Sequence, residues 1–328
     1  MSTMRAVLMG EQNDSFGSAD MLVTGTRSIP EAGAGEVLIK TTACGVNGPD
    51  LMQRRGLYPA PKGASDLLGL EVSGIVAAVG EGVFGWSVGD EICGLTNGGA
   101  YAEFVAVDAR HCLPVPKGVP LVDAAGLCET YFTVWSNVFY GYDVPAGGLF
   151  LVHGGGGGIG STCIQLGAAR GLRVFATEGP GGLAFCAELG AERVIDYTAE
   201  DFVAITREAG GADIILDIVG GDNIAKNIKA ANHDARIIQL AFARGSKVEI
   251  NLMPVMLKRL NYTGSTLRTR PDAFKAAIAS ELEAEVWPLF ATGQLAAVTH
   301  TVLPLQEASQ AHAMMEAAGH RGKILLKV

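Results

Sequence analysis

The segment Leu149-Phe-Leu-Val-His-Gly-Gly-Gly-Gly-Gly-Ile-Gly160 decides the fold of this 328-residue chain. Within it, Gly155, Gly157 and Gly160 satisfy the pattern G-x-G-x-x-G, and an apolar helical stretch over 159–170 follows. Such glycines let the backbone turn tightly and approach a pyrophosphate, which the free N–H groups at the start of the helix bind. A flexible linker is the alternative for a glycine run, but linkers do not stand between a buried strand and an apolar helix. The segment therefore predicts dinucleotide binding.

Over the next hundred residues, short apolar runs alternate with helical stretches. The runs lie at 149–152, 173–177, 194–195, 213–217, 236–240 and 262–265. Apolar strands separated by helices predict a parallel sheet that is covered on both faces. We therefore expect an α/β, doubly wound Rossmann domain over residues 123–266.

The part of the chain before this domain has a different pattern. Five short stretches carry Val, Ile or alternating apolar residues, with Gly, Pro and Asp between them, at 5–9, 36–43, 71–79, 90–94 and 101–107. This spacing predicts an all-β, barrel-like domain. Pro114, Pro116 and Pro120 mark a connector, which places the domain boundary between residues 122 and 123. After residue 266 the pattern mixes helices and strands.

Composition excludes several classes of function. The net charge is −9, with 25 Lys and Arg and no run of five basic residues, so a nucleic-acid partner is not expected. No apolar stretch approaches the roughly 20 residues of a membrane helix, and residues 1–10 lack the apolar core of a signal peptide. The six cysteines form no C-x-x-C pair and predict buried thiols in a reducing, cytoplasmic compartment.

Further motifs are spread over nearly the whole chain. They are Cys44-Gly-Val-Asn47 with Asp50 and Arg54, Gly56-Leu-Tyr-Pro59, Gly69-Leu-Glu-Val-Ser-Gly74, Val88-Gly-Asp90, Gly99-Ala-Tyr-Ala-Glu-Phe-Val105 and Gly322-Lys-Ile324. With the glycine run, they resemble the medium-chain dehydrogenase/reductase superfamily, specifically its zinc-independent, zeta-crystallin-like quinone oxidoreductases. The resemblance implies a GroES-like β-barrel catalytic domain of residues 1–122, completed by 267–328, with the Rossmann domain inserted.

The resemblance also implies roles for individual residues. Asn47 and Tyr58 are similar to family positions that line the nicotinamide and substrate cleft, where they would be catalytic. The expected cofactor-binding residues are Asn47, Thr133, Gly154, Gly157, Gly158, Ile159, Gly160, Glu178, Tyr197, Gly220, Ala241 and Phe242. Thr133 would lie near the phosphate end, Tyr197 beside the adenosine phosphate, and the strand ends at 220–221 and 240–243 near the nicotinamide. The alternative for Tyr58 and Tyr197 is simple packing, with the hydroxyl in water.

Zinc is not expected in this chain. Zinc-dependent members of the superfamily hold the metal with Cys, His and Cys or Asp, and a catalytic site needs three protein ligands. The matching positions here are Asn47, Leu70 and Glu129, and leucine cannot bind a metal. Cys44 and Cys128 lie off register, and the six histidines have no metal-type spacing.

Without a Lewis acid, a quinone is a better acceptor than an unactivated ketone, because its conjugation spreads the incoming charge. We therefore predict NAD(P)H:quinone oxidoreductase activity on a small quinone, with Tyr58 or a water as proton donor. Two alternatives stay open: an NADPH-dependent enone or enoyl reductase, and a non-catalytic, cofactor-binding redox sensor. A homodimer, or a dimer of dimers, through residues 261–266 is also expected, since related enzymes pair at this sheet edge.

The choice between NADPH and NADH rests on conflicting signals. The resemblance favours NADPH, with NADH possible. Glu178 stands 18 residues after Gly160, where an acidic side chain bonds the ribose hydroxyls and favours NADH. Residues 177–183 supply no cation for a 2′-phosphate, so the sequence analysis looks to Arg268 or Arg270 for one. The alternative for Glu178 is a loop carboxylate turned to solvent.

Overall fold

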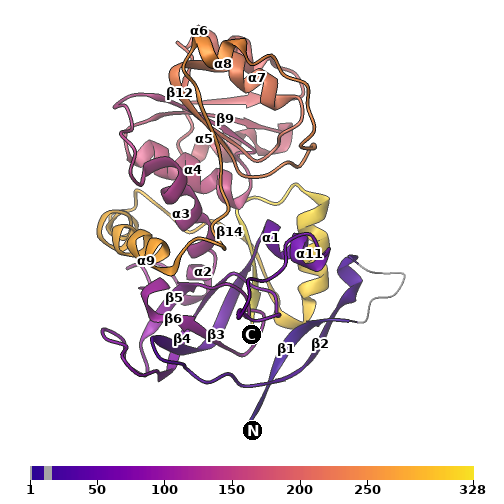
Figure 1. The fold of residues 1–328 in the computed structure, drawn as a ribbon, viewed down its shortest axis with the longest axis vertical. Coiled ribbons are helices and arrows are strands. Elements are labelled where there is room, and N and C mark those ends of the chain that lie inside the picture. The colour runs from indigo at the N-terminus through magenta and orange to yellow at the C-terminus, as the bar shows by residue number, and fades with distance from the viewer. Residues whose placement is uncertain (1, 11–16) are drawn as a thin grey trace. The chain divides into compact units, whose positions relative to one another are not determined.

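The computed structural model describes residues 2–10 and 17–328 (Figure 1). The chain forms two compact units, of which the first contains Met1–Phe132 with Arg268–Val328 and the second Thr133–Leu267. The sequence pattern predicts the first boundary at 122/123. Helix α2 (Leu121–Ala124) packs on strands of the first unit, so the chain leaves that unit at residue 132.

The second unit is built on a six-stranded parallel sheet with the order β10-β9-β8-β11-β12-β13. Its strands are β8 (Leu149–His153), β9 (Arg173–Glu178), β10 (Arg193–Asp196), β11 (Ala212–Asp217), β12 (Ala231–Gln239) and β13 (Asn261–Gly264). The helical segments are η3 (Trp135–Phe139), α4 (Gly158–Ala169), η4 (Pro180–Gly182), α5 (Leu183–Glu188), α6 (Phe202–Glu208), α7 (Asn223–Ala230) and α8 (Met253–Leu257). From β8, successive strands are added on one side of the sheet as β9 and β10, and then on the other side as β11, β12 and β13. Ligands of such sheets bind at the point between β8 and β11 where the strand order reverses.

Both faces of this sheet are covered, as the unbroken apolar runs predicted. Leu149 and Leu151 of β8 pack into one core cluster with Phe202 of α6 and Ile228 of α7. Phe150 points to the other face, where a Cβ on Gly167 of α4 would lie 3.1 Å from its ring. The missing side chain at position 167 therefore lets α4 pack closely against β8 and β9.

The first unit carries a seven-stranded sheet and a two-stranded one. Its strands are β1 (Thr3–Met9), β2 (Leu22–Ser28), β3 (Glu36–Val46), β4 (Glu71–Val79), β5 (Glu91–Leu95), β6 (Phe104–Asp108), β7 (Cys112–Pro114), β14 (Thr299–Pro304) and β15 (Lys323–Lys327). The helical segments are η1 (Ala19–Met21), α1 (Gly48–Arg54), η2 (Ala109–His111), α2, α3 (Cys128–Val134), α9 (Asp272–Glu281), η5 (Leu282–Val286), α10 (Trp287–Ala291), η6 (Leu305–Glu307) and α11 (Ala308–Ala317). Strand β3 pairs with β4, β6 and β15, so the C-terminal strand completes the sheet that the N-terminal part begins.

The predicted fold class is confirmed, with a GroES-like domain and a parallel-sheet Rossmann domain. The prediction of buried thiols is also confirmed, since all six cysteines are free and buried. In the described ranges no helix is both long and apolar enough to cross a lipid bilayer.

Candidate functional site

The glycine run forms a tight loop between β8 and α4. The amides of Gly154 and Gly155 both donate to the carbonyl of Thr177, at 3.1 Å, which ties the loop to the end of β9. A Cβ on Gly160 would lie 2.0 Å from the carbonyl oxygen of Gly154, so only glycine fits there. A Cβ on Gly157 would meet no described atom within 4 Å. The loop is thus closely packed on its inner side and open at Gly157, while Gly158 and Ile159 begin the helix.

The Glu178 side chain lies against this loop. Its carboxylate accepts hydrogen bonds from the amide of Gly156 at 2.5 Å and from its neighbour Gly179 at 2.9 Å. The carboxylate is therefore held at the end of β9 and is not a loop side chain turned to solvent. This position is the one in which a carboxylate meets the ribose of a dinucleotide.

A cation that the sequence analysis missed lies near Tyr197. The guanidinium carbon of Arg244, in the loop after β12, lies 5.4 Å from the centre of the Tyr197 ring. The Tyr197 hydroxyl in turn lies beside Gly179, where an added Cβ would be 3.2 Å from it. Arg244 and Tyr197 thus lie close to Gly179, the residue after Glu178. The sequence could not place the loop that carries Arg244 relative to β10.

Arg268, one of the two residues expected to supply a cation to the cofactor, is bound to backbone carbonyls of the first unit. Its Nε and Nη2 atoms donate to the carbonyl of Asn97, at 2.9 and 2.5 Å, and the residue is 6% exposed. Nη1 donates to the carbonyl of Tyr58 at 3.4 Å. The Arg268 guanidinium is thus hydrogen-bonded to carbonyls of the first unit. Arg270 lies over the Phe274 ring of the same unit.

Of the remaining predicted cofactor residues of the second unit, Gly220, Ala241 and Phe242 follow the ends of β11 and β12. Gly220 has a φ of +66° and its amide donates to Asp217 Oδ1 at 2.9 Å. The Ala241 carbonyl accepts from the Gln239 side chain at 2.6 Å, and Phe242 is exposed. Thr133 begins this unit, and its carbonyl accepts from the Asn137 amide group at 2.8 Å.

In the first unit, Asn47 belongs to a buried network with two charged residues. Its Nδ2 donates to Glu71 Oε1 at 2.8 Å, and Lys323 Nζ lies 2.8 Å from the same oxygen. Lys323 also donates to Asn47 Oδ1. All three residues are less than a tenth exposed. The sequence signal for Glu71 and Lys323 was a charged residue at the start of an apolar strand; such a charge is seldom buried unless it is paired.

Glu129, Tyr58 and Arg268 form a second group in this unit. The Glu129 amide donates to Glu71 Oε2 at 2.9 Å, whereas the Glu129 carboxyl has no hydrogen bond to any described residue. Burial, followed by the charge of Glu71, raises the pKa of Glu129 to about 8. Burial and the charge of Glu129 also raise the pKa of Tyr58. The structure thus brings both residues into one electrostatic environment.

Asp50 and Arg54 hold α1 in place. The Asp50 carboxylate accepts from the amides of Asn47 and Gly69, each at 2.9 Å, although burial raises its pKa to about 6. Arg54 Nη1 lies 3.1 Å from His312 Nδ1 of α11. Asn47, the residue directly before α1, is therefore held in a fixed position.

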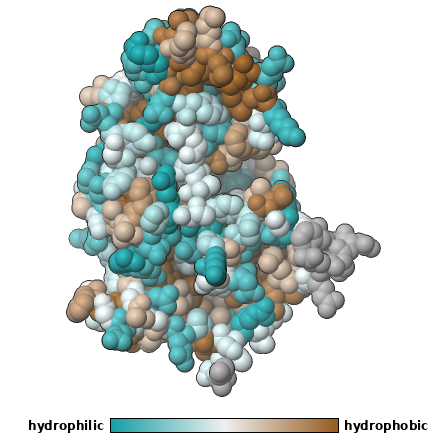
Figure 2. Space-filling view, in the orientation of Figure 1, coloured by the Kyte–Doolittle hydropathy of each residue, from teal (hydrophilic) through white to brown (hydrophobic). Residues whose placement is uncertain are grey.

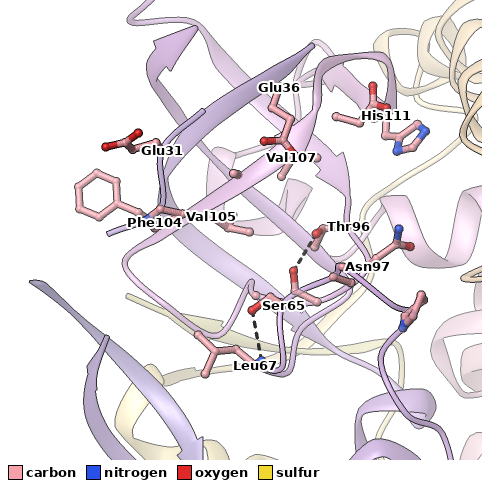
Figure 3. A pocket seen from close by; sticks show the side chains of 18 of the residues that line it. Glu31, Glu36, Ser65, Leu67, Thr96, Asn97, Phe104, Val105, Val107 and His111 are labelled. Carbon is pink, nitrogen blue, oxygen red and sulfur yellow. Dashed lines mark hydrogen bonds between the residues drawn. The ribbon is translucent and has the colours of Figure 1, made fainter. Parts of the chain in front are cut away.

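A separate hollow of about 890 Å³ also lies in the first unit (Figure 3). Side chains from β3, β6 and the segment after β5 line it, whereas Asn47, Tyr58 and Glu129 are not among its described lining residues. Ligand atoms of Asp108, His111 and Asp272 at its edge lie within 4.8 Å of one another. Both Asp108 oxygens already accept from Arg110, and His111 Nε2 lies 3.0 Å from the Asp272 carbonyl. These contacts already use both Asp108 oxygens and His111 Nε2.

Comparisons with known proteins identify relatives over the whole chain. Residues 33–117 match the family described as alcohol dehydrogenase GroES-like domain, and residues 189–326 match zinc-binding dehydrogenase. The quinone oxidoreductase of Rattus norvegicus is 30% identical, covering 98% of this chain and 97% of that protein. A mycobacterial protein solved with NADPH has a TM-score of 0.85 and 28% identity, covering 99% of this chain and 100% of that one. The CurK enoyl reductase has a TM-score of 0.85 and 25% identity, covering 100% and 99%.

Proposed function

Because the chain belongs to the medium-chain dehydrogenase/reductase superfamily, we propose that it is a zinc-independent NAD(P)H:quinone oxidoreductase. The observation that carries the proposal is the Lys323 ammonium, which lies 2.8 Å from Glu71 beside Asn47. A positive charge from the protein thus stands next to Asn47, the first of the three positions where zinc-dependent members hold their metal. Leu70, at the second position, is buried and apolar. The similarity to mammalian quinone oxidoreductases supports this choice of substrate.

The residues of the second unit fit a nicotinamide dinucleotide. The open side of the loop at Gly157 leaves room for a pyrophosphate, and the start of α4 offers backbone N–H groups to it. When bound, the cofactor supplies the hydride. The protein itself would then bind the dinucleotide, hold the quinone at Asn47 and Tyr58, and provide a proton.

Turnover with purified protein tests this proposal. NADPH oxidation is measured with several small quinones and with α,β-unsaturated carbonyl compounds. We expect the larger kcat/KM with the quinones. The enoyl reductase is the second candidate, favoured by the likeness to CurK, and a larger kcat/KM with the enones would establish it instead. Cofactor binding without turnover of either class would identify a redox sensor.

We predict that activity does not depend on zinc. Besides the apolar Leu70, the first ligand position holds Asn47, whose side-chain amide is already bound to Glu71 and Lys323. Dialysis against a chelator is therefore expected to leave kcat unchanged. Elemental analysis that finds about one zinc per active chain would contradict the prediction.

We predict a homodimer that forms through the edge of the Rossmann sheet. Strand β13 is the last strand in the sheet order, and an unpaired edge favours association. Just before it, Leu252, Met253, Met256 and Leu257 are all more than half exposed. Figure 2 shows apolar surface at the end of the molecule that carries α8 in Figure 1. Such patches mark interaction sites.

Light scattering at micromolar concentration checks this assembly. The wild-type chain should have the mass of two chains, and Met256→Glu should lower it to that of one. The matched control is Phe84→Glu, because Phe84 is exposed on the first unit and should leave the mass unchanged. A monomeric wild-type chain would refute the prediction.

We predict a preference for NADPH that is weak and depends on Arg244. Arg244 and Tyr197 can hold a 2′-phosphate between them, whereas Glu178 favours a free ribose hydroxyl. Replacing Arg244 by Ala should weaken NADPH binding about tenfold, since a charged hydrogen bond contributes about 1.5–3 kcal/mol, and should leave NADH binding unchanged. Dissociation constants from nicotinamide fluorescence measure both. Equal losses for the two cofactors would show that Arg244 does not distinguish them.

A further inference from the structure

We propose that Glu129 carries the proton that the reduced substrate takes up, and that the network around Glu71 positions it for this role. The inference rests on the proposed function, because hydride addition to a quinone or an enone leaves an oxyanion. That oxygen needs a proton from a nearby acid. The sequence alone suggests Tyr58 or a water as the source, and it places Glu129 only at a position that holds a zinc ligand in other members.

Glu71 and Glu129 are two neighbouring carboxyl groups with very different surroundings. Glu71 is fully buried, and both of its oxygens have partners: Asn47 and Lys323 at Oε1, and the Glu129 amide at Oε2. A Cβ on Gly45 would lie 2.1 Å from Glu71 Oε1, so the glycine is what makes room for this carboxylate. Three donors thus satisfy the two oxygens of the Glu71 side chain.

The Glu129 carboxyl lacks such donors among the residues that the structure describes. It is faced by Glu71 from β4, Asp50 from α1, Lys323 from β15 and Arg268, of which the two carboxylates disfavour its ionisation and the two cations favour it. Lys323 is bound to Glu71 and Asn47, and Arg268 to two carbonyls. When two carboxyl groups share a site and only one has partners, the other holds the proton.

Glu129 is also a better acid than the neighbouring Tyr58. The pKa of Glu129 is about 8, so its carboxyl is mostly protonated at pH 7 and can still release the proton. The pKa of the Tyr58 hydroxyl is raised above its usual 10, first by burial and then by the charge of Glu129. Glu129 as a residue is partly exposed, whereas Glu71 is fully buried.

The step balances without a further reactant. The hydride from the nicotinamide forms a bond to the substrate, and the electron pair of the reduced bond moves onto the substrate oxygen. The O–H bond of Glu129 then breaks as the new O–H bond forms on that oxygen. Solvent returns a proton to the Glu129 carboxylate before the next turnover.

Replacement of Glu129 by Gln tests the proposal. An amide keeps the shape of the side chain but is not an acid, so kcat at pH 7 should fall about a hundredfold, a typical contribution of general acid catalysis. In the wild-type chain kcat should fall as the pH rises through about 8, because Glu129 loses its proton there. The Gln variant should lack this fall, whereas Tyr58→Phe should retain it. Glu91→Gln, at an exposed position of β5, is the control that should behave as wild type.

An infrared spectrum separates this proposal from the proposed function. At pH 7 the wild-type chain should show the carbonyl band of a protonated carboxylic acid, because this pH lies below the pKa of Glu129 and above that of Asp50, and the band should be missing from Glu129→Gln. A missing band in the wild type, or a Gln variant that keeps more than a third of kcat, would overturn the role of Glu129 alone. A wild-type chain with a normal band and no turnover of quinones or enones would overturn the proposed function, and the donor role with it. Unchanged NADPH affinity and melting temperature show that the variant is folded.

Discussion

Replacement of Gly160 by Ala is expected to weaken cofactor binding at least about a hundredfold, a loss of about 2.7 kcal/mol. The added Cβ would lie 2.0 Å from the Gly154 carbonyl oxygen and 2.7 Å from the Gly155 Cα atom, and both atoms belong to backbone that cannot rotate away. The loop must therefore shift outward, into the space that a pyrophosphate would occupy. The free energy of unfolding should also fall by about 1–3 kcal/mol, as in other overpacked sites.

Gly157→Ala is the matched variant in the same loop. Nothing described lies within 4 Å of a Cβ there, and a φ of −76° is ordinary for alanine. Its unfolding free energy should stay within about 0.5 kcal/mol of wild type, while NADPH binding falls because the methyl group faces the open side. Urea denaturation and fluorescence titration separate the two effects. Equal affinity of all three proteins for NADPH would contradict the assignment of this loop to the cofactor.

The Rossmann unit could be predicted because its signals are local. The apolar runs, the glycine spacing and the helix after Gly157 all lie within short stretches of sequence, and each agrees with the same fold. Elements with weak periodicity were missed. Strand β2 holds only two apolar residues in seven, and α1 contains Gly48 and Pro49 in its seven residues, so neither repeats an apolar pattern long enough to indicate its structure.

The candidate site was only partly predictable, because its contacts join distant parts of the chain. Asn47 was identified from its motif, but its partner Lys323 lies 276 residues away. Only the pairing of β15 with β3 brings the two together. Arg244 was overlooked, and the partners of Arg268 were not foreseen, for the same reason: a cation in a loop has no assigned partner until the fold places the loop. Burial, which sets the pKa of Glu129, is likewise a property of the folded chain.

Replacement of Lys323 by Met is expected to lower the free energy of unfolding by about 3–5 kcal/mol. Lys323 is the cation paired with the fully buried Glu71, and its ammonium also donates to the carbonyl of Val46 at 3.2 Å. Without it, a negative charge stays buried beside two further carboxyl groups, Asp50 and Glu129. That arrangement costs far more than the loss of an exposed ion pair, which contributes about 0–1 kcal/mol.

A double variant shows whether the charge or the lost packing is responsible. In Lys323→Met with Glu71→Gln, the charge at position 71 is removed together with its partner, so we expect at least half of the lost stability to return. Lys327→Met, in the same strand but exposed, should change stability by less than about 0.5 kcal/mol. Urea denaturation of the four proteins measures these differences. If the double variant is no more stable than Lys323→Met, then packing of the lysine side chain, and not its charge beside Glu71, holds β15 against β3.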